Sequence, residues 1–178
     1  MNETKDLEKI NKKLTEEYYE ITQDILENPE YQRRLEYHHH ENRSVYTHCL
    51  IVSYYSYKVA KFLRLDYRSA AIAGLLHDFY YEDWQMNPKH GLKNMHGFVH
   101  AKQALNNSQI YFKEKMNDKI NDSIVKHMFP LTFFPPKYIE GWIITIVDKI
   151  VSLEVLKQSK QLYKYVGLAL IFKTFKIK

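Results

Sequence analysis

The stretch AAIAGLLHDFYYED, residues 70–83, is the part of the chain from which its fold and site are inferred. Its first half is apolar and rich in alanine, which predicts a buried helix, and it leads to His77-Asp78, two side chains that can both bind a metal ion. Adjacent side chains on a helix point roughly 100° apart and do not normally share a ligand. At a helix end, with other helices converging on it, this divergence allows them to bind a metal centre from two sides.

Size and composition predict one globular domain. The chain has 178 residues, of which 45% are apolar and 26% charged, enough for one core and too few for two. The lone Cys49 excludes an internal disulfide and a cysteine-based zinc site, which fits a reducing cytoplasm. The N-terminal sequence has no signal-peptide pattern, and the apolar run Val166–Phe172 is far shorter than the ~20 residues that span a bilayer. We therefore expect a cytoplasmic protein without a membrane partner.

The formal net charge of +5 raises the question of a nucleic-acid partner. The lysines are spread along the chain and concentrated at its ends, without an arginine-rich block or a nucleic-acid-binding motif. We expect no specific nucleic-acid binding, since a mildly basic site for phosphorylated substrates explains the charge equally well.

Helical periodicity runs through most of the chain. An apolar stripe at steps of three and four predicts an amphipathic helix over residues 4–28, ended by Asn28-Pro29, which packs on the main body or on a second copy. Further helices are expected at 45–63, 67–77, 98–115 (which can break at 106–108), 118–127, 138–156 and 158–175, with loops at 37–43 and 79–97. Ser44 and Asp66 are the expected helix caps. The nearly all-apolar helix 138–156 is expected to be central. Because no paired strands are indicated, we predict an all-α fold, a single-domain helical bundle.

Several histidines and aspartates lie at predicted helix ends or within apolar helices. They are His48, His77, Asp78, His96, His100, His127 and Asp148. Each histidine alone is more typical of a cap or a buried hydrogen-bonding group than of a ligand, and Asp148 alone could pair with a lysine. Within GWIITIVDKIVSLEV, however, a carboxylate is costly unless it is paired or ligated. As a set, these side chains predict a site of mixed His and carboxylate ligands for Mn, Fe, Co or Zn.

The order of these residues resembles the HD domain, a superfamily of helical metal-dependent phosphohydrolases. The similarity rests on His48, the doublet His77-Asp78 within LLHDF, and the late Asp148 within IVDKI, and it covers residues 40–156. It implies that these four residues hold a first metal ion.

Some members of this superfamily bind two metal ions. Their two additional histidines correspond to His100 and His127, with Asp78 bridging to the second ion. His96 is then expected near the substrate. The resemblance also implies the domain organisation: residues 1–36 as an amphipathic helical extension on the core, 37–157 as the HD metal-binding domain, and 158–178 as a C-terminal helix of the same domain.

The implied activity is hydrolysis of a phosphate mono- or diester in a nucleotide or another small phosphorylated metabolite. Two cations ~4 Å apart activate a water as hydroxide and neutralise the phosphate, with Asp78 at the centre of the chemistry. No protein nucleophile is needed, and Cys49 is expected to pack rather than react. Asp83 either orients a water or is a solvated loop carboxylate.

Small stand-alone bacterial HD hydrolases share further motifs with this chain: His40, SVYTHC at residues 44–49 and KHMFPLT at 126–132. The cyclic-dinucleotide branch carries a Gly-Tyr-Pro triplet, but here Met128-Phe129-Pro130 follows His127. The alarmone-hydrolase branch has a Glu-Asp pair two residues after the doublet, whereas Glu82-Asp83 follows after three.

Candidate substrate-binding residues are named from their position in the sequence. Arg43 is the first choice for phosphate, because a guanidinium donates two parallel hydrogen bonds. The others are His40, His96 and Lys126; Lys102 and Lys137 are weaker candidates. The expected partner is a small phosphorylated substrate, and the amphipathic N-terminal helix allows a homodimer. A non-catalytic metal- or nucleotide-sensing HD module is the alternative to the enzyme, and a basic nucleic-acid-binding helical protein is a third class.

Overall fold

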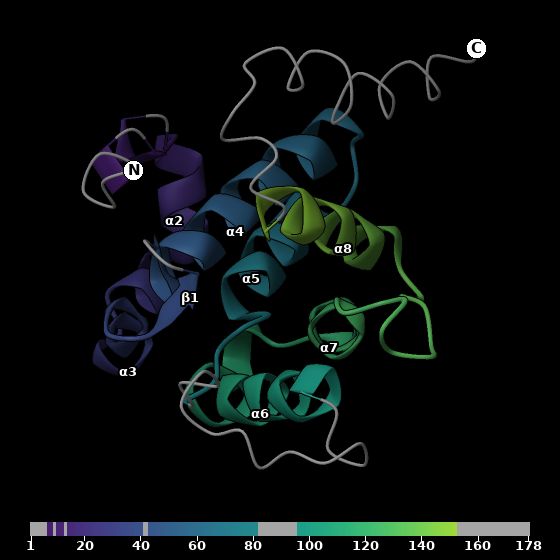
Figure 1. Cartoon of the computed structure of the whole chain (residues 1–178). Helices are drawn as coiled ribbons and strands as arrows, with labels where there is room; N and C mark the ends of the chain where they lie inside the picture. Colours follow the sequence, from purple (N-terminus) through teal and green to yellow (C-terminus); the bar gives the residue numbers. More distant parts are fainter. Residues whose placement is uncertain (1–6, 9, 13, 41–42, 82–95, 153–178) are drawn as a thin grey trace.

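Side-chain caps mark where several of the helices begin. The computed structural model describes residues 7–8, 10–12, 14–40, 43–81 and 96–152, and within them the chain is an all-α single domain (Figure 1). The helices are α2 (Glu16–Leu26), α3 (Pro29–Gln32), α4 (Val45–Phe62), α5 (Tyr67–Leu76), α6 (His96–Tyr111), α7 (Asp118–Lys126) and α8 (Ile139–Ser152), with 3-10 turns η1 (Arg33–Leu35) and η4 (Lys113–Lys115). The expected caps are confirmed: Ser44 accepts from Thr47 N–H and Asp66 from Ser69 N–H. None of the described helices has the length and apolarity needed to cross a bilayer.

Two predictions about local structure are wrong. The single helix over residues 4–28 is interrupted at Thr15, whose extended backbone and side-chain bond to Tyr18 N–H start α2 anew. The segment expected as a loop at 37–43 contains a short antiparallel ribbon of β1 (His38–His40) and β2 (Arg43–Ser44). Helix α6 runs without a break at 106–108. The helix expected at 158–175 lies outside the described residues.

Helix α5 occupies the middle of the domain, where it packs against α2, α4, α7 and α8 (Figure 1). Small residues allow this, and α4 approaches α5 closely at Gly74, where an added Cβ would lie 2.6 Å from the Cα of Ser53. Ser53 in turn donates to Ala71 O (2.6 Å) and shares a hydrogen bond with the hydroxyl of Tyr18 (2.7 Å). Residues 69–76 of α5 are all buried, and this part of the helix leads to His77 and Asp78 in the interior of the domain.

Helix α8 is placed by a buried carboxylate near its start. Glu140 accepts hydrogen bonds from Lys119 Nζ on α7 (2.9 Å) and from Asp66 N–H before α5 (3.1 Å). The helix is less central than its apolar sequence suggested, because Ile139, Trp142 and Ile146 remain exposed. Its opposite face packs on α4 and α7, and this face brings Asp148 to the helix ends that carry the histidines.

Candidate metal centre

His77 caps the end of α5, and its own turn fixes its tautomer. Its Nδ1 donates to the carbonyl of Gly74 (2.8 Å), which leaves Nε2 as the ring nitrogen that could bind an ion once it is deprotonated. That Nε2 is buried and has no hydrogen-bond partner among the described residues. Metal-binding histidines are commonly held in this way, by a hydrogen bond from the nitrogen that does not bind the ion.

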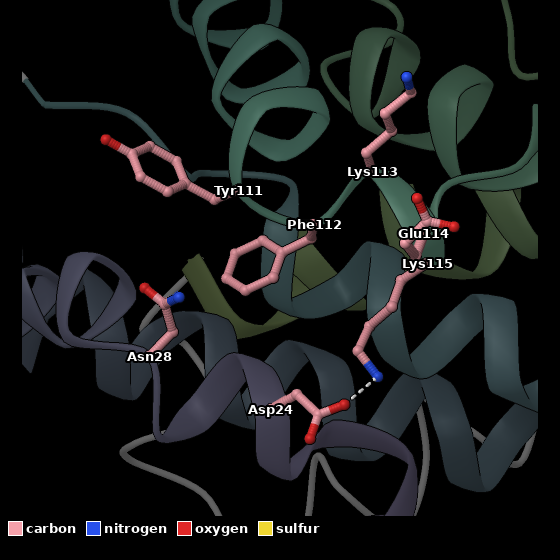
Figure 2. A pocket seen from close by; sticks show the side chains of 7 residues that line it. All are labelled: Asp24, Asn28, Tyr111, Phe112, Lys113, Glu114 and Lys115. Atoms are coloured by element: carbon pink, nitrogen blue, oxygen red, sulfur yellow. Dashed lines mark ion pairs between the residues drawn. The ribbon is translucent and has the colours of Figure 1, made fainter.

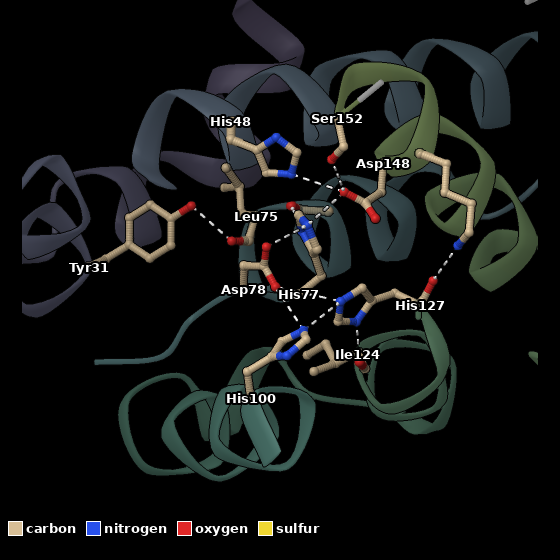
Figure 3. Close-up of polar contacts among 12 residues, drawn as sticks. Tyr31, His48, Leu75, His77, Asp78, His100, Ile124, His127, Asp148 and Ser152 are labelled. Atoms are coloured by element: carbon tan, nitrogen blue, oxygen red, sulfur yellow. Dashed lines mark hydrogen bonds and ion pairs between the residues drawn. The ribbon is translucent and has the colours of Figure 1, made fainter. Parts of the chain in front are cut away.

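Three side chains form a first triad: His48 from the first turn of α4, His77 and Asp78 (Figure 3). Each offers one ligand atom, and these atoms lie within 4.8 Å of one another. Asp148 from α8 joins them, because its Oδ1 lies 3.0 Å from His48 Nε2 and 3.7 Å from His77 Nε2. Ser152, one turn later, donates to the same Oδ1 (3.3 Å).

A second triad consists of Asp78, His100 from α6 and His127 at the end of α7 (Figure 3). His127 repeats the arrangement of His77, since its Nδ1 donates to the carbonyl of Ile124 (2.7 Å). Its Nε2 then faces His100 Nε2 at 3.2 Å. Two histidine nitrogens turned toward one carboxylate in a buried site are a chemically reasonable set of ligands for a cation.

Asp78 connects the two triads through different oxygens. Its Oδ2 lies 3.4 Å from His77 Nε2, whereas its Oδ1 lies 3.4 Å from His100 Nε2 and 3.5 Å from His127 Nε2. All of these side chains are buried. The carboxylate is therefore in place to bridge two cations.

The protonation states differ between the triads. Burial lowers the pKa of His127 to about 4, so its imidazole is neutral at pH 7, the form that binds metals. Burial also disfavours a charged His77, but Asp78, Cys49 and Asp148 together outweigh it and raise the pKa of His77 well above the usual value. Burial disfavours ionised Asp148, yet its contacts with His48 and His77 hold the pKa of this carboxyl well below its usual range.

The donor chemistry of the site is that of imidazole and carboxylate. Cys49 is adjacent to His48 in sequence, but it is buried, and burial raises the pKa of its thiol. A buried thiol with a raised pKa is a poor nucleophile, which agrees with the packing role expected for Cys49. Two buried triads of histidine and aspartate can thus hold metal ions, of a kind that the structure does not specify.

All six predicted metal ligands come together, from five helices. They are His48, His77, Asp78, His100, His127 and Asp148. The substrate-binding candidates are less informative: Asp83 lies outside the described residues, as do the side chains of His40, Arg43 and His96. Lys126 is paired with Asp122 (2.5 Å) one turn back on α7.

Three side-chain contacts around the triads are absent from the sequence-based prediction. Ser152 contacts Asp148, Lys149 Nζ donates to the carbonyl of His127 (3.3 Å), and the Tyr80 ring lies 5.4 Å from that of His100. Ser152 is one helical turn after Asp148, so its spacing alone could have indicated the contact. The other two depend on how distant helices meet.

A surface groove of about 300 Å³ lies away from these residues (Figure 2). Asp24 and Asn28 line one side and residues 111–115 the other, and Lys115 pairs with Asp24 across it (2.7 Å). The groove contains no residue of either triad.

Comparison with known proteins does not assign the chain to a family. No protein-family model matches it, and no curated protein matches it either. Membership of the HD-domain superfamily, inferred from the order of the candidate ligands in the sequence, therefore stays a prediction.

Proposed function

We propose that this protein is a metal-dependent phosphohydrolase of the HD type, which acts on a nucleotide or another small phosphorylated metabolite. The observation that carries the proposal is the position of Asp78, whose two oxygens face two separate sets of buried histidines. The order of the ligands in the sequence, which resembles that of the HD domain, supports the same assignment.

Each ligand has a distinct role in this proposal. His48, His77 and Asp148 would hold the first cation, His100 and His127 the second, and Asp78 both. When bound, a pair of divalent cations lowers the pKa of a water for attack and neutralises the charge of a phosphate ester. The chain itself fixes the histidine tautomers through the carbonyls of Gly74 and Ile124.

A non-catalytic metal- or nucleotide-sensing module with the same helical fold is the second candidate. It is favoured by the closeness of the ligand atoms and their burial, which suit a closed binding site as well as a reactive one. The two candidates differ in turnover, because a sensor binds the cations and the phosphate compound without consuming it.

Elemental analysis of the purified protein, run beside hydrolysis of an aryl phosphate monoester and diester with added manganese, tests the proposal. We expect about two metal ions per chain and turnover that a chelator abolishes. Asp78→Ala should remove both metal and turnover while circular dichroism stays helical. Asp24→Ala, which removes an exposed aspartate of α2 outside both triads, is the control and should retain both.

Two results would count against the enzyme. Metal binding without hydrolysis of either ester, or of a nucleotide panel, would favour the sensing module. A protein that binds no divalent cation under any loading condition would exclude both candidates.

A further inference from the structure

The surface that follows His127 is almost free of charge. Segment 128–138 leads from α7 into α8, and the exposed residues between 128 and 147 are apolar or proline, with Lys137 as the one exception. Glu140, also in this range, is buried against Lys119. Six large side chains, which we call the α8 patch, are exposed here: Leu131, Phe133, Phe134, Ile139, Trp142 and Ile146.

The α8 patch extends over a loop and a helix face. Ile139, Trp142 and Ile146 are spaced by three and four residues, so they form one stripe on the outer side of α8. The ring of Phe129 packs edge-on against Trp142, with centroids 5.3 Å apart, and so links the segment after α7 to this stripe. The opposite side of the helix is buried and carries Asp148.

The size of the patch is unusual for a monomer. Exposed fractions are 83% for Phe133, 74% for Phe134, 59% for Leu131, 57% for Ile139 and 38% for both Trp142 and Ile146. With roughly 200 Å² for a fully exposed side chain of this size, the six expose on the order of 700 Å². The largest apolar patch of a typical monomer is about 300–600 Å². A standard protein interface buries about 800 Å² on each partner.

We propose that the α8 patch is the interface of a homodimer, in which it packs against the same patch of a second copy. An uncharged apolar stripe complements itself, and the low charge matches the apolar core of homodimer interfaces. A bilayer is a less suitable partner, because peripheral membrane binding generally needs basic residues beside the apolar ones, and among the exposed residues of 128–147 only Lys137 is basic. This inference does not depend on the proposed enzymatic activity.

Sedimentation velocity of the full chain, at protein concentrations up to about 100 µM, tests the dimer. The wild type should sediment as a dimer, and the Phe133→Ser/Phe134→Ser double variant and Ile146→Glu as monomers, with dissociation constants raised at least about 100-fold. Phe62→Ser is the control, because the Phe62 side chain is also largely exposed (67%) but lies at the end of α4, outside the patch. It should remain dimeric. Circular dichroism should show the same helix content for all four proteins.

The proposal is overturned by a wild type that stays monomeric over the whole range. It is equally overturned if the patch variants dimerise as the wild type does, since the dimer then uses another face. A monomeric wild type that binds phospholipid vesicles through Phe133 and Phe134 would assign the patch to a membrane surface. One that dimerises only when residues 153–178 are removed would assign it to that segment.

Discussion

The two triads share Asp78 but differ in the rest of their ligands. The first is completed by two histidines and a second carboxylate, Asp148, whereas the second has two histidines and no carboxylate of its own. A cation in the first triad is therefore neutralised more completely. We infer that the first triad binds a divalent ion more tightly, and that the second ion is the one that exchanges.

The largest effect should come from removing the carboxylate that distinguishes the triads. Asp148→Ala is expected to lower the affinity for the first cation at least about 100-fold. Removing a ligand should reduce metal affinity at least as much as removing a residue that only hydrogen-bonds to a ligand. His127→Ala should weaken the second cation and leave the first in place. Metal titration by calorimetry checks both variants. If either variant lowers the affinity for both cations equally, the two triads form a single site.

A smaller effect is expected from Gly74, whose carbonyl contacts His77 of the first triad only. In Gly74→Ala the new methyl would overlap the backbone of Ser53, and the unfolding free energy should fall by about 1–3 kcal/mol. The displaced Gly74 carbonyl would also disturb the tautomer of His77 and thus the first cation. Denaturant unfolding and metal content are the measurements.

Gly141→Ala is the comparison variant. Its added Cβ would meet the side chain of Pro136 rather than a helix backbone, so the loss of stability should be smaller. If Gly141→Ala lowers the unfolding free energy more than Gly74→Ala does, the close approach of α5 to α4 is not what positions the first triad.

Protons should distinguish the triads as well. In the metal-free protein the pKa of His77 is raised, so at pH 7 the first cation must displace its proton, whereas His127, with a pKa of about 4, has none to lose. Binding of the first ion should therefore strengthen by up to about tenfold per pH unit until the raised pKa is passed. Above about pH 5, protonation of His127 should not affect binding of the second ion. Calorimetry in buffers of different ionisation enthalpy counts the released protons, and equal release by both ions would contradict the assignment.

The same raised pKa has a consequence for the stability of the metal-free protein. A group whose pKa is higher in the folded state stabilises that state fully below its unfolded value, here 6.5, and the contribution is lost as the pH rises through the folded pKa. The metal-free protein should thus become less stable above neutral pH. Loading it with manganese should remove this dependence, since the cation then takes the place of the proton.

Part of the candidate metal site could be predicted from the sequence, because the surroundings of His77-Asp78 and Asp148 are chemically distinctive. A histidine-aspartate doublet at the end of an alanine-rich helix and an aspartate among isoleucines and valines are costly unless they have partners. Helix caps such as Ser44 could also be predicted, because a cap binds a backbone N–H only a few residues later in the sequence. Local rules therefore sufficed for these helix starts, whereas the full set of candidate ligands came from the HD-domain resemblance.

Features that depend on distant contacts could not be predicted in this way. An all-apolar helix sequence predicts that the helix is buried, but it does not show which other elements cover it. We therefore expected α8 to be central, whereas in the structure one of its faces is exposed. Thr15 has cap chemistry, yet the apolar stripe continues through it, and periodicity suggested one helix where the structure has a break. The contact of Tyr80 with His100 depends on how the segment after α5 packs against α6, which could not be predicted from the sequence.

The smallest effect should come from Ser152, which touches the first triad alone. The imidazoles of His77 and His127 are oriented by backbone carbonyls, which substitution cannot remove, whereas Asp148 is oriented by the Ser152 hydroxyl. Ser152→Ala removes one hydrogen bond, worth about 0.5–1.5 kcal/mol, and should weaken the first cation roughly 2- to 10-fold without changing the second. Ser152→Thr should restore the affinity. Ser123→Ala, which removes a hydroxyl bonded to Lys119 O on α7, is the control and should change neither site. A lower affinity for the second cation in Ser152→Ala would show that the triads are coupled through Asp78 and do not bind their cations independently.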